Sequence, residues 1–147
     1  MVNSSQKVLN KTIGQLGESL ACKYLVNRGL KIIERNYWRK WGELDVVARE
    51  TSGKVHFVEV KSVSHETKVD LEREVTRLSA SRPQQADETW RPEEQVHQFK
   101  LHQIQKAVHT WLSDHNYEGD WQIDVIAIRM VPREKYATVK YIENVTL

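Results

Sequence analysis

An acid and a base stand two residues apart in a stretch that otherwise reads as a buried β-strand. Residues 56–63, HFVEVKSV, are rich in valine and include Phe57, yet they carry Glu59 and Lys61. Strand residues two apart point to the same face of a sheet. Burying charge is costly unless the charge is paired or bound to a metal, so these two side chains indicate a site with a chemical role.

A second acid lies in the preceding predicted strand. The segment ELDVVARE, residues 43–50, places Glu43 and Asp45 on one face. If a hairpin pairs it with residues 55–63, Asp45 and Glu59 can lie close together on adjacent strands. Two carboxylates that close repel each other in a low-dielectric site unless a proton or a cation lies between them. We therefore predict that they hold Mg²⁺ or Mn²⁺, which prefer oxygen ligands.

Three more side chains are candidates for the same site. Lys61 would point toward whatever the metal holds, where its ammonium could orient an attacking water or neutralise charge on a phosphate. Glu18, at the edge of the apolar stripe of a predicted helix, could complete the metal shell. Glu43 is a further candidate ligand, although a carboxylate directly after Gly42 in a turn needs no metal to explain it. The pattern is that of a metal-assisted phosphodiesterase, and its alternative is a solvated ion pair on an edge strand.

A turn beside these residues combines aromatic rings with cations. In WRKW, residues 38–41, Arg39, Lys40 and Trp41 are candidates for contact with a nucleic acid, because bases stack on aromatic rings while cations hold phosphates. The alternative is that the tryptophans cover the end of the sheet and the charges belong to the turn.

Other polar residues are better explained without a metal. Asp124 lies within the apolar segment WQIDVIAI, where a buried carboxylate that accepts hydrogen bonds from a helix N-terminus or an arginine is favoured over a ligand. The six histidines show neither HxxxH nor HExxH spacing, so a zinc site is not indicated. The chain also lacks a GxxxxGK phosphate loop, which argues against an ATPase.

The apolar periodicity defines the elements that must position these residues. The order αβββ–αββ predicts an α/β fold, in which a central mixed sheet of about five strands is flanked by helices. We expect a single domain over residues 1–147, without internal repeats. The first half is predicted to contain a helix from Thr12, as N-cap, to Arg28, with Gly29 as its stop, and strands at 30–38, 43–50 and 55–63. A long polar, flexible loop is expected at 64–91, in which VDLEREVTRL could form a helical turn or two. A second helix that begins at Pro92 and strands at 121–131 and 138–145 complete the predicted elements.

The composition indicates the class of protein and its cellular location. The 147 residues are 39% hydrophobic and 29% charged, as in soluble globular proteins. There is no apolar run long enough for a membrane span and no apolar segment typical of a signal peptide at the N-terminus, so we expect a cytoplasmic protein without membrane contact. Cys22 is the only cysteine, which excludes an internal disulfide. The net charge of +2 does not by itself indicate a nucleic-acid-binding protein.

Several motifs in order resemble a known family. GQLGESLACKYLVNRGLKIIERNYW, then GELDVVA, then FVEVKS, a later helix with Lys100 and the strand DVIAI resemble the YraN-like family of uncharacterised, predicted endonucleases. That family is grouped with the PD-(D/E)xK restriction-endonuclease-like superfamily, near the archaeal Holliday-junction resolvases. The likeness extends over nearly the whole chain; its matching positions are Gly14, Gly17, Glu18, Asn36, Gly42, Glu43, Asp45, Phe57, Glu59, Val60, Lys61, Asp124, Ile142, Glu143 and Asn144.

The resemblance implies a restriction-endonuclease-like core and metal-dependent hydrolysis of phosphodiester bonds in DNA, including branched or single-stranded DNA. Asp45 and Glu59 would be the metal ligands, Lys61 the catalytic lysine and Glu18 the helix-borne acid. Lys100 matches a family position and is a candidate for nucleic-acid contact, with plain solvation on the polar side of its helix as the alternative.

The chain departs from the family pattern at two places. Val63 stands where an arginine usually follows the catalytic lysine, and the segment 64–91 is longer than its usual counterpart. Two other functions stay open: a catalytically inactive nucleic-acid-binding protein on the same scaffold, and a small-molecule phosphohydrolase. A homodimer would suit a nuclease that cuts two strands, but no residues in the sequence identify an interface.

Overall fold

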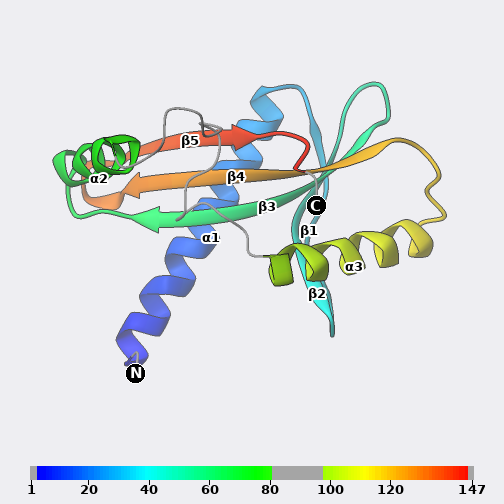
Figure 1. Cartoon of the computed structure of the whole chain (residues 1–147), viewed down its shortest axis with the longest axis horizontal. Coiled ribbons are helices and arrows are strands. Elements are labelled where there is room, and N and C mark those ends of the chain that lie inside the picture. Colours follow the sequence, from blue (N-terminus) through cyan, green and yellow to red (C-terminus); the bar gives the residue numbers. More distant parts are fainter. Residues whose placement is uncertain (1–2, 81–97, 146–147) are drawn as a thin grey trace.

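A helix and three strands are followed by two helices and two strands (Figure 1). The computed structural model describes residues 3–80 and 98–145. Within these ranges no helix combines the length and the hydropathy needed to cross a membrane. The elements are α1 (Ser4–Asn27), β1 (Lys31–Arg39), β2 (Gly42–Arg49), β3 (Val55–Ser64), α2 (Lys68–Ala80), α3 (Gln98–Asp114), β4 (Trp121–Val131), the 3₁₀ turn η1 (Pro132–Glu134) and β5 (Tyr136–Ile142).

The five strands form one mixed sheet in the order β1-β2-β3-β4-β5. Strands β3 and β4 are parallel, while the other neighbouring pairs are antiparallel. Helix α1 covers one face of the sheet and α3 covers the other (Figure 1). The α1 side is built on Ala21, Leu25 and Val58, and the α3 side on Phe57 and Trp111. The predicted α/β fold with a five-stranded mixed sheet is confirmed, and it is consistent with a restriction-endonuclease-like core.

Helix α1 ends as predicted but begins earlier. Gly29 has φ +93°, and Leu30 N–H donates to Leu25 O at 3.0 Å, which is the Schellman arrangement of a helix stop. The predicted start at Thr12 is wrong, because Asn3 caps the helix by accepting from Gln6 N at 2.7 Å. Thr12 lies inside the helix and donates its hydroxyl to Val8 O. The first turns are exposed, including Val8 and Leu9, so they form no buried apolar stripe.

Small residues bring α1 close to the sheet. Its buried positions are Ile13, Gly17, Ala21 and Leu25, whereas the apolar Leu16 is 41% exposed. A Cβ atom at Gly17 would lie 2.8 Å from the Cβ of Ser62. The helix therefore contacts β3 through glycine and alanine, and this close approach brings the neighbouring Glu18 to the edge of the sheet.

The predicted loop over residues 64–91 needs a correction. Residues 68–80 form α2, whose start is capped by Thr67, because the Thr67 hydroxyl accepts from Asp70 N at 3.1 Å. Leu71 of this helix is buried. The turn or two predicted within VDLEREVTRL is part of a longer helix, which the many charged residues of this segment made hard to recognise from the sequence pattern. Residues 81–91 and the predicted helix start at 92–97 lie outside the described residues.

Asp124 joins three strands of the sheet, and it lies on β4 directly before the residue that pairs with Glu59. It is fully buried in β4 and accepts hydrogen bonds from His56 Nδ1, Gln122 Nε2, Tyr141 OH and the backbone N–H of Asn144. The structural role favoured for Asp124 is therefore correct, although its partners are neither a helix N-terminus nor an arginine. Since this network joins β3, β4 and β5, it holds the strand that carries Glu59.

Candidate active site

The candidate site lies where β2 and β3 separate. The pairing of β2 with β3 runs from Arg49↔Val55 to Val46↔Val58, whereas β3 stays paired with β4 up to Ser64. Continuing the β2–β3 register by one residue would set Asp45 opposite Glu59. The two predicted ligands therefore occupy facing positions one residue beyond the end of the β2–β3 ladder.

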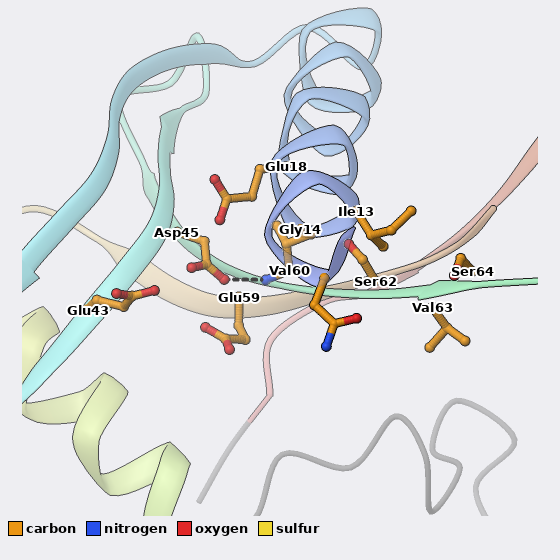
Figure 2. A pocket seen from close by; sticks show the side chains of 11 residues that line it. Ile13, Gly14, Glu18, Glu43, Asp45, Glu59, Val60, Ser62, Val63 and Ser64 are labelled. Atoms are coloured by element: carbon orange, nitrogen blue, oxygen red, sulfur yellow. Dashed lines mark hydrogen bonds between the residues drawn. The ribbon is translucent and has the colours of Figure 1, made fainter. Parts of the chain in front are cut away.

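Asp45 fills the gap that this separation leaves. Its carboxylate accepts a hydrogen bond from the backbone N–H of Val60, with a distance of 2.8 Å from N to Oδ2 (Figure 2). The side chain is only 5% exposed. Because a buried N–H group needs an acceptor, the carboxylate takes the place of a backbone carbonyl of β2. This contact fixes the Asp45 carboxylate beside Glu59.

Glu59 is buried with one carboxylate oxygen unsatisfied. The residue is 9% exposed, and its Oε2 atom is buried without a hydrogen-bond partner among the described residues. The other oxygen, Oε1, lies 3.7 Å from Lys100 Nζ on α3, which is a loose ion pair. An unsatisfied buried carboxylate oxygen is energetically costly, so Oε2 is positioned to receive a further donor or a cation.

Burial disfavours charge on both carboxyl groups of the pair. Burial raises the pKa of Asp45 well above its usual range, and the neighbouring charge of Glu59 raises it further, while the Val60 N–H acts against both. Burial also raises the pKa of Glu59, against the lowering effects of Lys100 and of a hydrogen bond from the Asp45 carboxyl group. Without a cation the pair therefore keeps a proton at neutral pH, and a bound cation would displace that proton.

Glu18 approaches the site from α1. Burial raises its pKa, while the Arg35 guanidinium, 3.8 Å from Oε2, and a side-chain hydrogen bond from Asn36 lower it. Asn36 has φ +53°, a left-handed conformation that asparagine tolerates better than most residues. It lies in β1 at the register position of Asp45. The turn of the backbone at this residue helps to hold Glu18 at the edge of the site.

The acids surround one cavity between α1, β2 and β3 (Figure 2). Its volume is about 510 Å³. All four predicted acids line it, namely Glu18, Glu43, Asp45 and Glu59, together with Asn10, Ile13, Gly14, Val60, Ser62, Val63 and Ser64. The exposed residues Glu43 and Ser64 lie on its rim, so the cavity opens to solvent.

Lys61 is not part of the cavity lining. It is half-buried on β3 and, because strand side chains alternate, it lies on the Glu59 face one pleat further along. Ser62 and Val63 line the cavity instead. The structure therefore brings the predicted carboxylates together around the cavity and leaves the predicted lysine beside it.

The donor set fits a hard divalent cation that keeps part of its water shell. In the described ranges, no three His, Cys, Asp or Glu side chains form a closed cage for a metal. Mg²⁺ is commonly held by one or two carboxylates, with waters and substrate phosphates in the remaining positions. The buried pair Asp45 and Glu59, with the unsatisfied Oε2 atom, matches that mode of binding rather than a structural zinc site.

The predicted nucleic-acid contacts divide into two groups. Arg39 pairs with Asp114 at 2.9 Å and stacks on Tyr37, and Trp41 donates its indole N–H to Thr110 at 3.2 Å. Both side chains therefore attach the β1–β2 hairpin to α3. Lys40 is exposed at the tip of the hairpin, while Lys100 is placed beside Glu59 rather than on a remote solvated face.

Asn36 is a site residue to which sequence reasoning gave no role of its own. The signal was available, because asparagine is depleted in strands and Asn36 interrupts the predicted strand KIIERNYW. Its left-handed backbone and its contact with Glu18 could not be read from that pattern.

Comparisons with known proteins point to one family. The model of "Uncharacterised protein family UPF0102" matches residues 17–128. A UPF0102 protein of Trichlorobacter lovleyi is 34% identical over 136 residues, which cover 92% of this chain and 90% of the relative. Relatives from Pelobacter propionicus and Campylobacter fetus are 38% and 30% identical, over 86% and 90% of this chain and 76% and 92% of their own lengths. The names of these relatives state no activity.

Proposed function

Because this chain belongs to the UPF0102 family of uncharacterised proteins, which assigns it no activity, we propose from the site itself that it is a divalent-metal-dependent endonuclease acting on DNA. The observation that carries the proposal is the buried pair Asp45 and Glu59, with Glu59 Oε2 unsatisfied, at the fork between β2 and β3. A purely structural carboxylate pair would be expected to have its buried oxygens satisfied.

Asp45 and Glu59 are the proposed ligands of Mg²⁺ or Mn²⁺. The backbone N–H of Val60 holds Asp45 in place, so the ligand is oriented before the metal arrives. When bound, the ion supplies Lewis acidity to a phosphoryl oxygen and lowers the pKa of a coordinated water. Glu18, which reaches the same cavity from α1, is proposed to accept a hydrogen bond from water in the site.

The two lysines near Glu59 have separate proposed roles. Lys61, one pleat beyond Glu59 on β3, orients the attacking water or stabilises charge that develops on the phosphate. Lys100 neutralises part of the charge on Glu59 in the metal-free protein, and it can turn to a DNA phosphate once a metal ion takes over that role. Val63 supplies no phosphate contact, so these lysines carry that function.

The open cavity favours a polymer over a small molecule. A small-molecule phosphohydrolase normally encloses most of its ligand, whereas here the acidic cavity opens past Glu43 and Ser64 at its rim. Its carboxylates repel a phosphate until a cation is present. Binding to DNA is therefore expected to be strengthened by the metal, to depend on basic residues around the rim, and to weaken as salt rises.

The direct test is DNA cleavage by the purified protein. Labelled linear duplex, single-stranded and branched DNA are incubated with Mg²⁺, Mn²⁺ or EDTA, and the products are separated on denaturing gels. We expect cleavage with either metal and none with EDTA. A Glu59→Ala/Lys61→Ala double variant, purified in the same way, controls for contaminating nucleases and should be inactive. Equal cleavage by both proteins, or no cleavage under any condition, would refute the proposal.

A further inference from the structure

Trp38 differs from its neighbours at the tip of the β1–β2 hairpin. Arg39 and Trp41 are attached to α3 through Asp114 and Thr110. The Trp38 side chain is 63% exposed, the largest exposed fraction among the tryptophans that the structure describes. A tryptophan exposed to this degree in a strand contributes little to the core, so its ring is available to a partner.

The pairing of β1 and β2 places Trp38 beside the acidic cavity. Trp38 lies directly opposite Glu43, which lines the cavity. Directly opposed residues of antiparallel strands project their side chains from the same face, about 5 Å apart. The preceding pair, Tyr37 and Leu44, is buried in the core on the α3 side. Alternation therefore turns Trp38 and Glu43 away from α3.

The distance to the proposed ligands is short. Asp45 lies two residues from Glu43 along β2, which is about 7 Å in a strand. A ring at Trp38 is therefore within reach of the nucleotides next to a phosphate held at Asp45 and Glu59. Exposed Lys40 follows it at the hairpin tip, and a cation beside an aromatic ring is the combination that holds a phosphate and a base together.

We infer that Trp38 is a stacking platform for an unpaired base next to the phosphate that is cut, and that the substrate is DNA with a single-stranded segment at the cleavage site. The inference rests on the proposed function and deepens it. A base inside a duplex is stacked on both sides and must be unstacked before it can meet a protein ring. The exposed ring therefore discriminates in favour of single strands and the unpaired ends of branches.

The test compares binding of Trp38 variants to a single-stranded oligonucleotide and to its blunt duplex. Binding is measured by fluorescence anisotropy, in EDTA and with Ca²⁺. Trp38→Ala is expected to bind the single strand about tenfold more weakly, since stacking on an aromatic ring contributes on that order, and to bind the duplex within about twofold of wild type. Trp38→Phe, which keeps a ring, should retain most of the affinity. Val139→Ala shortens an exposed side chain on the opposite edge strand β5. This control should change neither the affinity for the single strand nor the affinity for the duplex.

Quenching of a 2-aminopurine base placed along the oligonucleotide adds a readout that a structural role would not move. We expect quenching by the wild type and its loss in Trp38→Ala. Unchanged single-strand affinity in Trp38→Ala, or an equal loss for single strand and duplex, would overturn the inference even if the wild type cleaves DNA. Selective loss of single-strand binding in a wild type that cuts no DNA would support the platform and refute the nuclease.

Discussion

Replacing Glu59 by glutamine is expected to lower the rate of DNA cleavage by about a thousandfold, since the variant loses a metal ligand and with it the charge stabilisation that the metal supplies. The amide is similar in size to the carboxylate but carries no charge, so the protein should fold normally. DNA binding measured in EDTA should not weaken, because the variant removes a negative charge from a site that receives phosphates. Single-turnover cleavage and anisotropy measure the two quantities separately.

Glu118→Gln is the control for this variant. It removes the same charge from an exposed position in the turn before β4, away from the acidic cavity. Its cleavage rate should stay close to that of the wild type. A Glu59→Gln protein that cleaves at the wild-type rate would contradict the assignment of Glu59, and an equal loss in both variants would show that net charge, rather than the site, controls the reaction.

Replacing Asp45 by asparagine is expected to abolish cleavage and, in EDTA, to make the protein more stable. At pH 8 the free energy of unfolding should rise by about 2 kcal/mol, because a buried carboxylate facing another one is removed. The amide oxygen that the substitution introduces can still accept from the Val60 N–H. The gain should shrink when Mg²⁺ is present, since the ion stabilises only the wild type.

The pH dependence of this difference follows from the raised pKa of Asp45. Below about pH 4 the carboxyl is protonated in the folded and the unfolded chain alike. As the pH rises, the unfolded chain loses this proton first, so the stability of the wild type falls until the raised folded pKa is passed. Urea unfolding in EDTA between about pH 4 and pH 8.5 should show the two proteins converging at low pH. A variant that is less stable than the wild type at pH 8 would contradict the repulsion between Asp45 and Glu59.

Much of the fold could be predicted because its strands and helices carry regular apolar periods. All five strands appear where the pattern indicated them, within two or three residues. The misses have physical causes. Eight residues before Thr12 are helical without burying a stripe, and most of the α2 side chains whose exposure is described are exposed, although Leu71 is buried. Periodicity reports burial, so elements that bury little escape it.

The facing positions of Asp45 and Glu59 follow from strand alternation and hairpin pairing, which are local properties. The hydrogen bond from Val60 N–H to Asp45, made where β2 and β3 separate, and the packing of the β1–β2 hairpin against α3 are long-range features. The same packing attaches Arg39 and Trp41 of WRKW to α3 and leaves Trp38 exposed. No local pattern contains that information.

The most direct measurement is a calorimetric titration of the metal-free protein with Mn²⁺. Binding is expected for the wild type and for Glu118→Gln, with release of protons, and it should be absent from both Asp45→Asn and Glu59→Gln. The proton release follows from the proton that the pair keeps without a cation. Equal Mn²⁺ binding by all four proteins, or no binding by the wild type, would contradict a metal site at Asp45 and Glu59.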